Sequence, residues 1–310
     1  MTLQGLHHIT AITGDAPRNV DFYARVLGLR MVKKTVNFDA PDVYHLYYGD
    51  ETGGPGSIMT FFEFPNAARG TAGDGMVHTI LWRVGSAEAL AFWERRLADE
   101  GVATRRDGDR LTFADPEGLA IELVVADDLP DAPLAATASP GIPAGHALQG
   151  FHGVRAYASR PERSADLLVT LGFQRREDGV WVTGEGTPRH AELHYDAPPV
   201  AVRGRDGGGT IHHVAWSAAD DDELARFRVL AAGGGAHPTP IIDRQYFHSV
   251  YFREPSGVLF ELASRDIGFA VDEPQETLGE ALLLPPQHEH LRDRLVDVLT
   301  PIENPRQAVA

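Results

Sequence analysis

Two histidine pairs and one glutamate could form a metal site in this chain. The pairs are His7-His8 and His212-His213, and the acid, Glu261, follows the second pair further along the sequence. Each pair lies in a short apolar run that is typical of a β-strand, where successive side chains point to opposite faces. One histidine of each pair can therefore point at a metal while its neighbour has another role. Two imidazoles and one carboxylate leave coordination positions open, as in non-haem Fe(II) oxygenases.

The strands that position these residues belong to a unit that repeats four times. Each unit opens with a β-like run containing histidine, and these runs are 6–12, 76–82, 151–157 and 211–216. An amphipathic helix is expected next, at 18–27, 88–100, 161–171 and 223–232. Near the end of each helix is a glycine suited to a left-handed C-cap: Gly28, Gly101, Gly172 and Gly233. Further short strands follow, and each unit closes on a strand with an acid: Glu63, Glu122, Glu192 and Glu261. The pattern predicts four βαβββ modules.

A segment rich in alanine, proline and glycine divides the chain. We place modules 1 and 2 in residues 1–126, a linker at 127–147, and modules 3 and 4 in residues 148–265. The remaining residues, 266–310, are expected to form a C-terminal strap with a helix at 289–299. Because this segment is rich in leucine, we expect it to pack over the modules or over a partner subunit.

Composition restricts the classes of function. The 310 residues are 43% hydrophobic, enough for substantial cores, and the net charge of −16 argues against binding to nucleic acid or to an anionic membrane. The absence of cysteine excludes disulfides, thiolate ligands and a cysteine nucleophile. The N-terminus has neither a basic region nor an apolar stretch typical of a signal peptide, so we expect a cytoplasmic protein.

Three short motifs carry a family resemblance. Residues 22–29, the Asp-Pro-Glu-Gly turn at 115–118 and the Glu-Pro-Ser-Gly turn at 254–257, with the Glu-Leu strands that follow both turns, resemble the vicinal oxygen chelate superfamily. This superfamily includes glyoxalase I, bleomycin resistance proteins and extradiol ring-cleaving dioxygenases. The resemblance covers about residues 5–265. It implies an α+β fold in which four βαβββ modules are paired into two cup-shaped half-barrels of mixed sheet.

The run at 243–257 resembles, more narrowly, the bacterial dioxygenases that open hydroquinone rings. This resemblance implies an enzyme that inserts O2 into a small dihydroxylated aromatic, either a hydroquinone, with or without substituents, or a catechol. It implies Fe(II), with Mn(II) as the alternative, held by His8, His213 and Glu261. Around the substrate or behind the ligands it places His7, Thr10, His212, Arg244 and Tyr251. We also expect a homo-oligomer.

These five residues have expected roles in catalysis. His7 and His212 are expected in proton transfer or hydrogen bonding. Arg244 is expected to hold a substrate oxygen through its planar donors, and Tyr251 to orient the same group. Five further histidines have no such surroundings in the sequence, so we expect them in loops or in solvent: His45, His237, His248, His288 and His290.

Two sets of residues have the composition of a metal site. One is His8, Glu63, His213 and Glu261, and the other is His78, Glu122, His152 and Glu192. Periodicity does not choose between them. The doubled histidines, Thr10 and the aromatic run at 244–251 occur in modules 1 and 4, and these features favour the first set.

Glu63 separates two classes of enzyme. If it joined the metal, four protein ligands would suit a glyoxalase-type lyase or isomerase, and if it pointed away, three ligands would leave room for O2. The Phe-rich flanks of Glu63 and the proline after them differ from the endings of the other modules. We therefore predict three ligands. A metal-free binding protein of the bleomycin-resistance type ranks third, because such chains usually have two modules.

Overall fold

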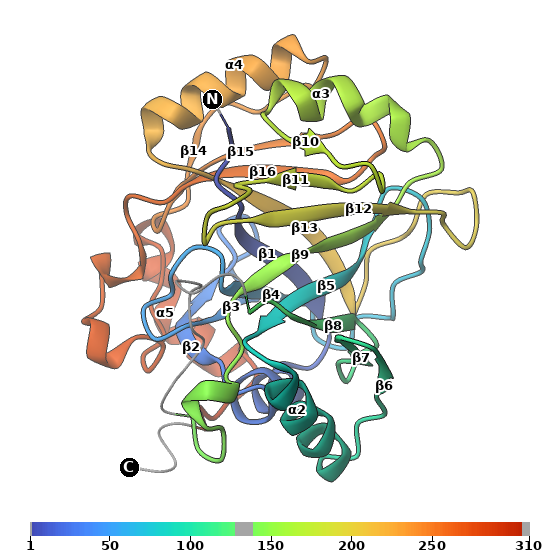
Figure 1. Ribbon diagram of the computed structural model, residues 1–310. Coiled ribbons are helices and arrows are strands. Elements are labelled where there is room, and N and C mark those ends of the chain that lie inside the picture. The colour runs from blue at the N-terminus through green and yellow to red at the C-terminus, as the bar shows by residue number, and fades with distance from the viewer. Residues whose placement is uncertain (1, 128–138, 306–310) are drawn as a thin grey trace.

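The computed structural model describes residues 2–127 and 139–305, which contain two eight-stranded mixed sheets (Figure 1). The first sheet has the strand order β14-β15-β16-β13-β1-β4-β3-β2. Module 1 supplies β1 (Leu6–Thr13), β2 (Arg30–Val36), β3 (Tyr44–Gly49) and β4 (Ile58–Glu63). Module 4 supplies β13 (Thr210–Ala218), β14 (Ile242–Asp243), β15 (His248–Arg253) and β16 (Leu259–Ser264).

The second sheet has the strand order β10-β11-β12-β9-β5-β8-β7-β6. Module 2 supplies β5 (Val77–Val84), β6 (Arg105–Asp107), β7 (Arg110–Ala114) and β8 (Ala120–Val125). Module 3 supplies β9 (Phe151–Tyr157), β10 (Gln174–Arg175), β11 (Trp181–Thr183) and β12 (Ala191–Asp196). The prediction of an α+β fold built from four βαβββ modules is confirmed.

The modules of each sheet join through their opening strands. Within a module the opening strand pairs in parallel with the closing strand, as β1 does with β4 and β13 with β16. Between modules, β1 pairs antiparallel with β13, and β5 pairs antiparallel with β9. Module 1 is thus joined to module 4, and module 2 to module 3. The predicted boundary at 127–147 divides the sequence and not the sheets, and its residues 128–138 lie outside the described part.

The helices occupy the predicted places in the modules. They are α1 (Ala16–Val20) with a π-helical turn (Asp21–Val26), α2 (Ala87–Asp99), a 3-10 turn (Pro161–Ser164) leading into α3 (Ala165–Thr170), and α4 (Asp221–Gly233). Their starts follow from the sequence, because Ser86 accepts from the amide of Ala89 at the start of α2 and Asp220 from that of Glu223 at the start of α4.

Three of the four predicted C-cap glycines have the positive φ that this position requires. Gly28, Gly101 and Gly172 have φ of 73°, 72° and 89°. The fourth prediction, Gly233, was wrong, because α4 runs on through Gly233 and the left-handed residue is Gly235, with φ of 87°. In a run of three consecutive glycines, each can adopt this conformation, so local sequence does not choose among them.

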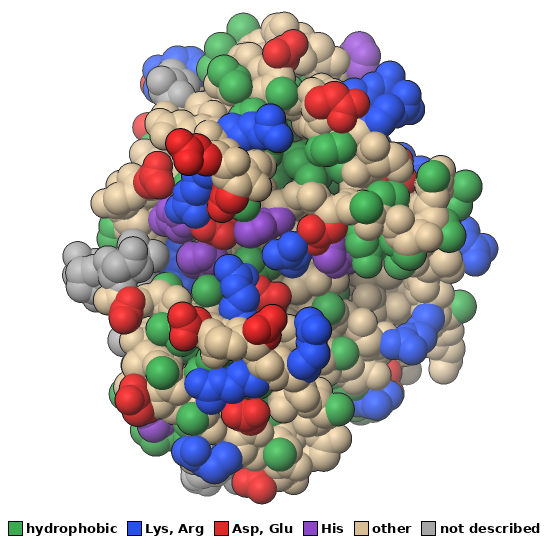
Figure 2. All heavy atoms as spheres, turned by 45° about the vertical axis from the view of Figure 1, so that its right-hand side comes forward, with side chains coloured by type: hydrophobic (Ala, Val, Ile, Leu, Met, Phe, Trp, Pro, Cys, Tyr) green, Lys and Arg blue, Asp and Glu red, His purple; other side chains and the backbone are tan. Residues whose placement is uncertain are grey.

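The larger of the two hydrophobic clusters among the described residues draws on both sheets. It contains the tryptophans Trp82, Trp93 and Trp216, all with no exposed surface. The helix α4 packs on β13, β15 and β16, while α2 packs on β5, β7 and β8 (Figure 1). Figure 2 shows one face, on which acidic and basic side chains alternate and histidine side chains gather near the middle. In the described residues no helix is long and apolar enough to cross a bilayer.

The C-terminal segment packs over module 1. It contains 3-10 turns (Phe269–Val271, Gln275–Thr277 and Pro286–Leu291) and α5 (Arg292–Val298), and another 3-10 turn (Ala144–His146) precedes β9. The predicted helix at 289–299 therefore begins three residues late, after the last 3-10 turn. Lys33 of β2 has no exposed surface and pairs with Asp272 at 2.7 Å and Glu273 at 2.9 Å. This buried cation fixes the strap to the first sheet.

Candidate metal centre

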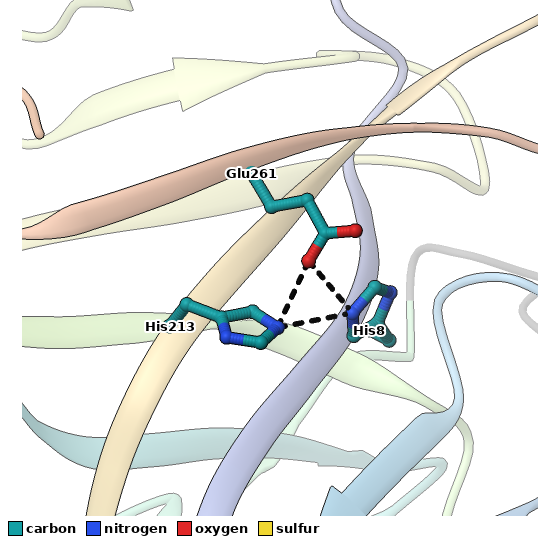
Figure 3. A group of neighbouring side chains, drawn as sticks. All are labelled: His8, His213 and Glu261. Atoms are coloured by element: carbon teal, nitrogen blue, oxygen red, sulfur yellow. Dashed lines mark hydrogen bonds and ion pairs between the residues drawn. The ribbon is translucent and has the colours of Figure 1, made fainter. Parts of the chain in front are cut away.

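Three of the predicted residues meet at the middle of the first sheet. His8 lies on β1, His213 on β13 and Glu261 on β16, and their side chains point toward one another (Figure 3). His8 Nε2 and His213 Nε2 are 3.3 Å apart, and they lie 3.1 and 2.9 Å from Glu261 Oε2. All three side chains are at most 5% exposed. The antiparallel pairing of β1 with β13 brings together residues from opposite ends of the chain.

The carboxylate of Glu261 is prepared for a cation. Its Oε1 accepts a hydrogen bond from Ser249 Oγ, whereas its Oε2 is buried and has no well-oriented hydrogen-bond donor among the described residues. His8 Nε2 and His213 Nε2 lie close to Oε2 without the orientation of a hydrogen bond. Burial raises the pKa of Glu261, but the imidazoles of His8 and His213 outweigh it and hold the pKa well below its usual value. An ionised oxygen with two imidazole nitrogens fits a divalent metal.

The first histidine of each pair contacts the second through its ring nitrogen. His7 Nδ1 lies 2.9 Å from His8 Nδ1, and His212 Nδ1 lies 2.8 Å from His213 Nδ1. A metal on Nε2 of His8 and His213 leaves their Nδ1–H groups to donate to His7 and His212. Such outer hydrogen bonds fix the tautomer and ring orientation of a ligand. The doubled histidines could therefore supply two ligands and two groups that align them.

A cavity of about 600 Å³ opens beside these residues. Its wall is mostly apolar and aromatic and includes Ile12, Phe38, Phe62, Phe64, Ile242, Phe247 and Leu259. The polar side chains in the wall include His8, His213 and His212, together with Arg244 and Tyr251. All strands of the first sheet except β2 contribute side chains, so the sheet curves around the cavity. Its size and lining suit a small aromatic molecule.

Arg244 and Tyr251 lie together in this wall. Arg244 Nε donates to Tyr251 Oη at 3.3 Å, and Arg244 also pairs with Asp39 at 3.2 Å. Burial raises the pKa of Tyr251, so the phenol keeps its proton. The side chain of Arg244 is 19% exposed. The structure thus places both predicted residues at the cavity.

His7 and Thr10 lie behind the cavity wall. His7 is 2% exposed and is not in the wall, and burial lowers its pKa well below the usual value. Thr10 has no exposed surface, and its Oγ1 is 2.9 Å from Thr60 Oγ1. Of the five predicted residues outside the ligand set, His212, Arg244 and Tyr251 therefore face the cavity.

The structure adds two residues that the sequence did not indicate. His45 was expected in a loop or in solvent, and this was wrong, because it lies on β3, is 8% exposed and lines the cavity. Its Nε2 is 2.9 Å from Thr60 Oγ1, and its Nδ1 is 2.8 Å from Tyr47 Oη. Tyr47 also lines the cavity. The alternation of the Tyr44–Gly49 strand, which puts His45 and Tyr47 on one face, was the available signal.

Glu63 points away from this group. Its Oε1 accepts from the backbone amide of Ala16 at 3.1 Å, and its carboxylate also has a hydrogen bond with Thr300. The residue of β4 that pairs with Thr10 of β1 is Thr60. The structure therefore brings together His8, His213 and Glu261 without Glu63.

Comparison with known families agrees with this arrangement. The sequence matches the Glyoxalase/Bleomycin resistance protein/Dioxygenase superfamily over residues 5–123 and 150–262. The chain belongs to this superfamily. The two matched regions correspond to the two halves that each contain two modules. The family resemblance predicted from the short motifs is confirmed.

Relatives of this superfamily member match over nearly their whole lengths. MhqO of Bacillus subtilis, named as a candidate ring-cleaving dioxygenase, is 41% identical over 96% of this chain and 96% of its own. The chlorohydroquinone/hydroquinone 1,2-dioxygenase of Sphingobium indicum is 33% identical over 95% of each chain. A crystal structure titled as a candidate dioxygenase from Bacillus subtilis superposes with a TM-score of 0.89, at 39% identity over 98% of each chain.

In this superfamily member, the side chains of the second predicted set do not converge as those of the first set do. The second set is His78, Glu122, His152 and Glu192. His78 is bonded to Asp196 at 3.1 Å, and Glu122 pairs with Arg110. Only His152 and Glu192 remain near each other, at 3.5 Å. The preference for the first set agrees with this geometry.

Proposed function

We propose that this protein is an Fe(II)-dependent extradiol-type dioxygenase that inserts both atoms of O2 into a hydroquinone-type ring. The observation that carries the proposal is the group of two histidines and one glutamate, with a buried carboxylate oxygen that accepts no well-oriented hydrogen bond, at the wall of an aromatic-lined cavity. The names of the relatives from Bacillus subtilis and Sphingobium indicum support ring cleavage and a hydroquinone substrate. A catechol is the alternative substrate, and Mn(II) the alternative metal.

His8, His213 and Glu261 would hold the metal. When bound there, Fe(II) would supply a centre with open positions for a phenolate oxygen and for O2. One carboxylate among the three ligands leaves the site with a net positive charge, which favours an anionic substrate oxygen. The aromatic wall, including Phe62 and Phe247, would position the ring and exclude water.

His212 would act as a hydrogen-bond donor at the cavity. Burial lowers its pKa to about 4, so the imidazole is neutral near pH 7. Because its Nδ1 accepts from His213 in the metal-bound state, its hydrogen is on Nε2. A neutral Nε2–H can donate to a substrate oxygen but cannot accept a proton there. Of the two roles predicted for His212, hydrogen bonding is the one that this contact supports.

Arg244 and Tyr251 would hold the oxygen that carries developing negative charge. The guanidinium is kept in place by Tyr251 and Asp39, and it presents fixed donors beside the cavity. Tyr251, whose phenol keeps its proton, can donate to the same oxygen. His7 would act only through His8. A homo-oligomeric state and a cytoplasmic location stay predictions.

The test is anaerobic loading with Fe(II), followed by oxygen-electrode assays on hydroquinones and catechols. We expect one O2 consumed per ring opened, with both labelled oxygen atoms in the product when ¹⁸O2 is used. Protein loaded with Zn²⁺ is the control, because that metal binds the same ligands without redox chemistry. Isomerisation of a thiol adduct without O2 uptake would instead favour the glyoxalase-type alternative.

A further inference from the structure

A second group of metal-binding side chains lies in the second sheet, outside the proposed active site. Glu192 and His194 are alternate residues of β12 and share one face of the sheet, and His190, directly before the strand, also approaches Glu192. His152 lies on β9, the parallel neighbour of β12. His190 and Glu192 are 8% and 5% exposed, and the side chain of His152 is 13% exposed. The sequence pattern His-Ala-Glu-Leu-His marks this face of β12.

The spacing within this group is that of ligands around a cation. His152 Nε2 lies 3.5 Å from Glu192 Oε2, and His190 Nε2 lies 3.5 Å from Glu192 Oε1. The donor atoms of these three residues all lie within 4.8 Å of one another. An N–H···O hydrogen bond is shorter, at about 2.9 Å. Neighbouring ligands of a tetrahedral metal with bonds of about 2.1 Å are roughly 3.4 Å apart.

Two further groups hold the carboxylate in place. Arg176 donates to Glu192 Oε1 at 2.6 Å, and His194 Nε2 lies 2.7 Å from Oε2. Outer contacts of this kind orient a ligand carboxylate. The group thus has two imidazoles and one oriented anion.

This group is not a copy of the one in the first sheet. Val214 lies opposite Phe260 in the first sheet, and Val154 lies opposite Leu193 at the equivalent position of the second sheet. This equivalence places Gly153 where the first sheet has His213. A Cβ at Gly153 would collide with the backbone of Glu192. His194 stands where the first sheet has Glu261. The second group therefore uses His152, one residue before the equivalent of His213, and Glu192, two residues before the equivalent of Glu261, and takes His190 in addition.

We propose that His152, His190 and Glu192 form a second divalent-metal site, suited to a borderline cation such as Zn²⁺. The site is weaker than the first for two reasons. Arg176 places a positive charge beside the carboxylate, and the buried Nδ1 of His152 has no hydrogen-bond partner among the described residues. Arg176 also lies 3.5 Å from Glu185, so it can move toward that exposed acid when a cation binds.

Equilibrium dialysis with Zn²⁺ tests this site. A double variant, His8→Ala with His213→Ala, removes the first site, and we expect it to keep one Zn²⁺ per chain where the wild type binds two. Adding His190→Asn should abolish the remaining Zn²⁺. The matched control is His78→Asn, which changes another strand histidine of the same sheet and should leave that Zn²⁺ bound. Circular dichroism of each variant identifies any that fail to fold.

Arg176→Gln gives a test that does not depend on loss of binding. Removing the guanidinium should tighten Zn²⁺ at the second site by about tenfold, because like charges no longer repel. Co²⁺, whose visible absorption reports nitrogen and oxygen coordination, should likewise bind more tightly to Arg176→Gln than to the wild type. A wild type that binds one Zn²⁺, with none in the double variant, would overturn the proposal. So would a second Zn²⁺ that His190→Asn leaves unchanged.

Discussion

Thr60 occupies in module 1 the position that Glu261 occupies in module 4. His8 and His213 are equivalent, and the residues two places after them, Thr10 and Ala215, pair with Thr60 and Glu261. Thr60 is fully buried, and its hydroxyl contacts Thr10 and His45, each at 2.9 Å. Glu63 is three residues further along β4. A neutral hydroxyl thus stands where a fourth, anionic ligand would otherwise be.

This asymmetry predicts unequal effects for the two acids that close modules 1 and 4. Glu261→Gln removes the anionic ligand. We expect metal affinity to fall by more than the roughly 10–100-fold that follows loss of a residue hydrogen-bonded to a ligand, and we expect no ring cleavage. Glu63→Gln should change metal content and O2 uptake little, because Glu63 contacts Ala16 instead. Metal analysis and oxygen-electrode rates check both variants. Equal metal loss in the two would contradict the three-ligand site.

The orienting histidines should separate metal affinity from turnover. Both His7→Phe and His212→Phe remove a partner of a ligand's Nδ1, so each should weaken metal binding by about 10–100-fold. At saturating metal, His7→Phe should recover most turnover, whereas His212→Phe should not, because His212 alone of the two lines the cavity. Titration of activity against Fe(II) measures both effects. Full recovery of His212→Phe would limit His212 to orienting His213.

Arg244→Lys should keep the metal and lose much of the turnover. Lysine supplies a point charge, but it lacks the planar set of donors that now contacts Tyr251 and Asp39. We expect a fall in kcat of at least about tenfold with unchanged metal content. Steady-state kinetics and metal analysis of the same preparation check this. A variant with wild-type kcat would remove Arg244 from the reaction.

Glu63 should make stability depend on pH. Burial raises its pKa, with hydrogen bonds from Ala16 and Thr300 opposing the shift. The folded state therefore binds a proton at Glu63 more tightly than the unfolded state does. The resulting contribution to the free energy of unfolding is complete below the ordinary carboxyl pKa of about 4.3, and it is lost as pH rises through the raised pKa. The glutamine side chain of Glu63→Gln resembles the protonated form. The free energy of unfolding of this variant should therefore increase relative to that of the wild type as pH rises from the ordinary carboxyl pKa through the raised one. Urea denaturation across this pH range checks it, and a pH-independent difference would contradict it.

The buried cation under the strap should contribute strongly to stability. Lys33→Met leaves Glu273, which is 7% exposed, without its partner, and breaking a buried pair costs about 3–5 kcal/mol. The matched control is Arg294→Met, which breaks an exposed pair with Asp42 and should cost at most about 1 kcal/mol. Chemical denaturation measures both. Similar losses in the free energy of unfolding of the two variants would show that the buried pair stabilises the fold no more than the exposed one.

Much of this arrangement could be predicted from local sequence. The four modules follow from alternating strands, helix periodicity and glycines, all of which act over a few residues. The doubled histidines and the acid of the last strand also stand out locally, and the structure brings His8, His213 and Glu261 within 3.3 Å.

Only the tertiary structure decided which side chains share the centre. The register of β4 against β1 puts Thr60 beside Thr10 and turns Glu63 toward Ala16, and a shift of one residue would reverse every face. The curvature of the first sheet likewise carries His45, on β3, into the cavity wall. Register and curvature arise from contacts between strands far apart in the chain, so no local spacing contains them.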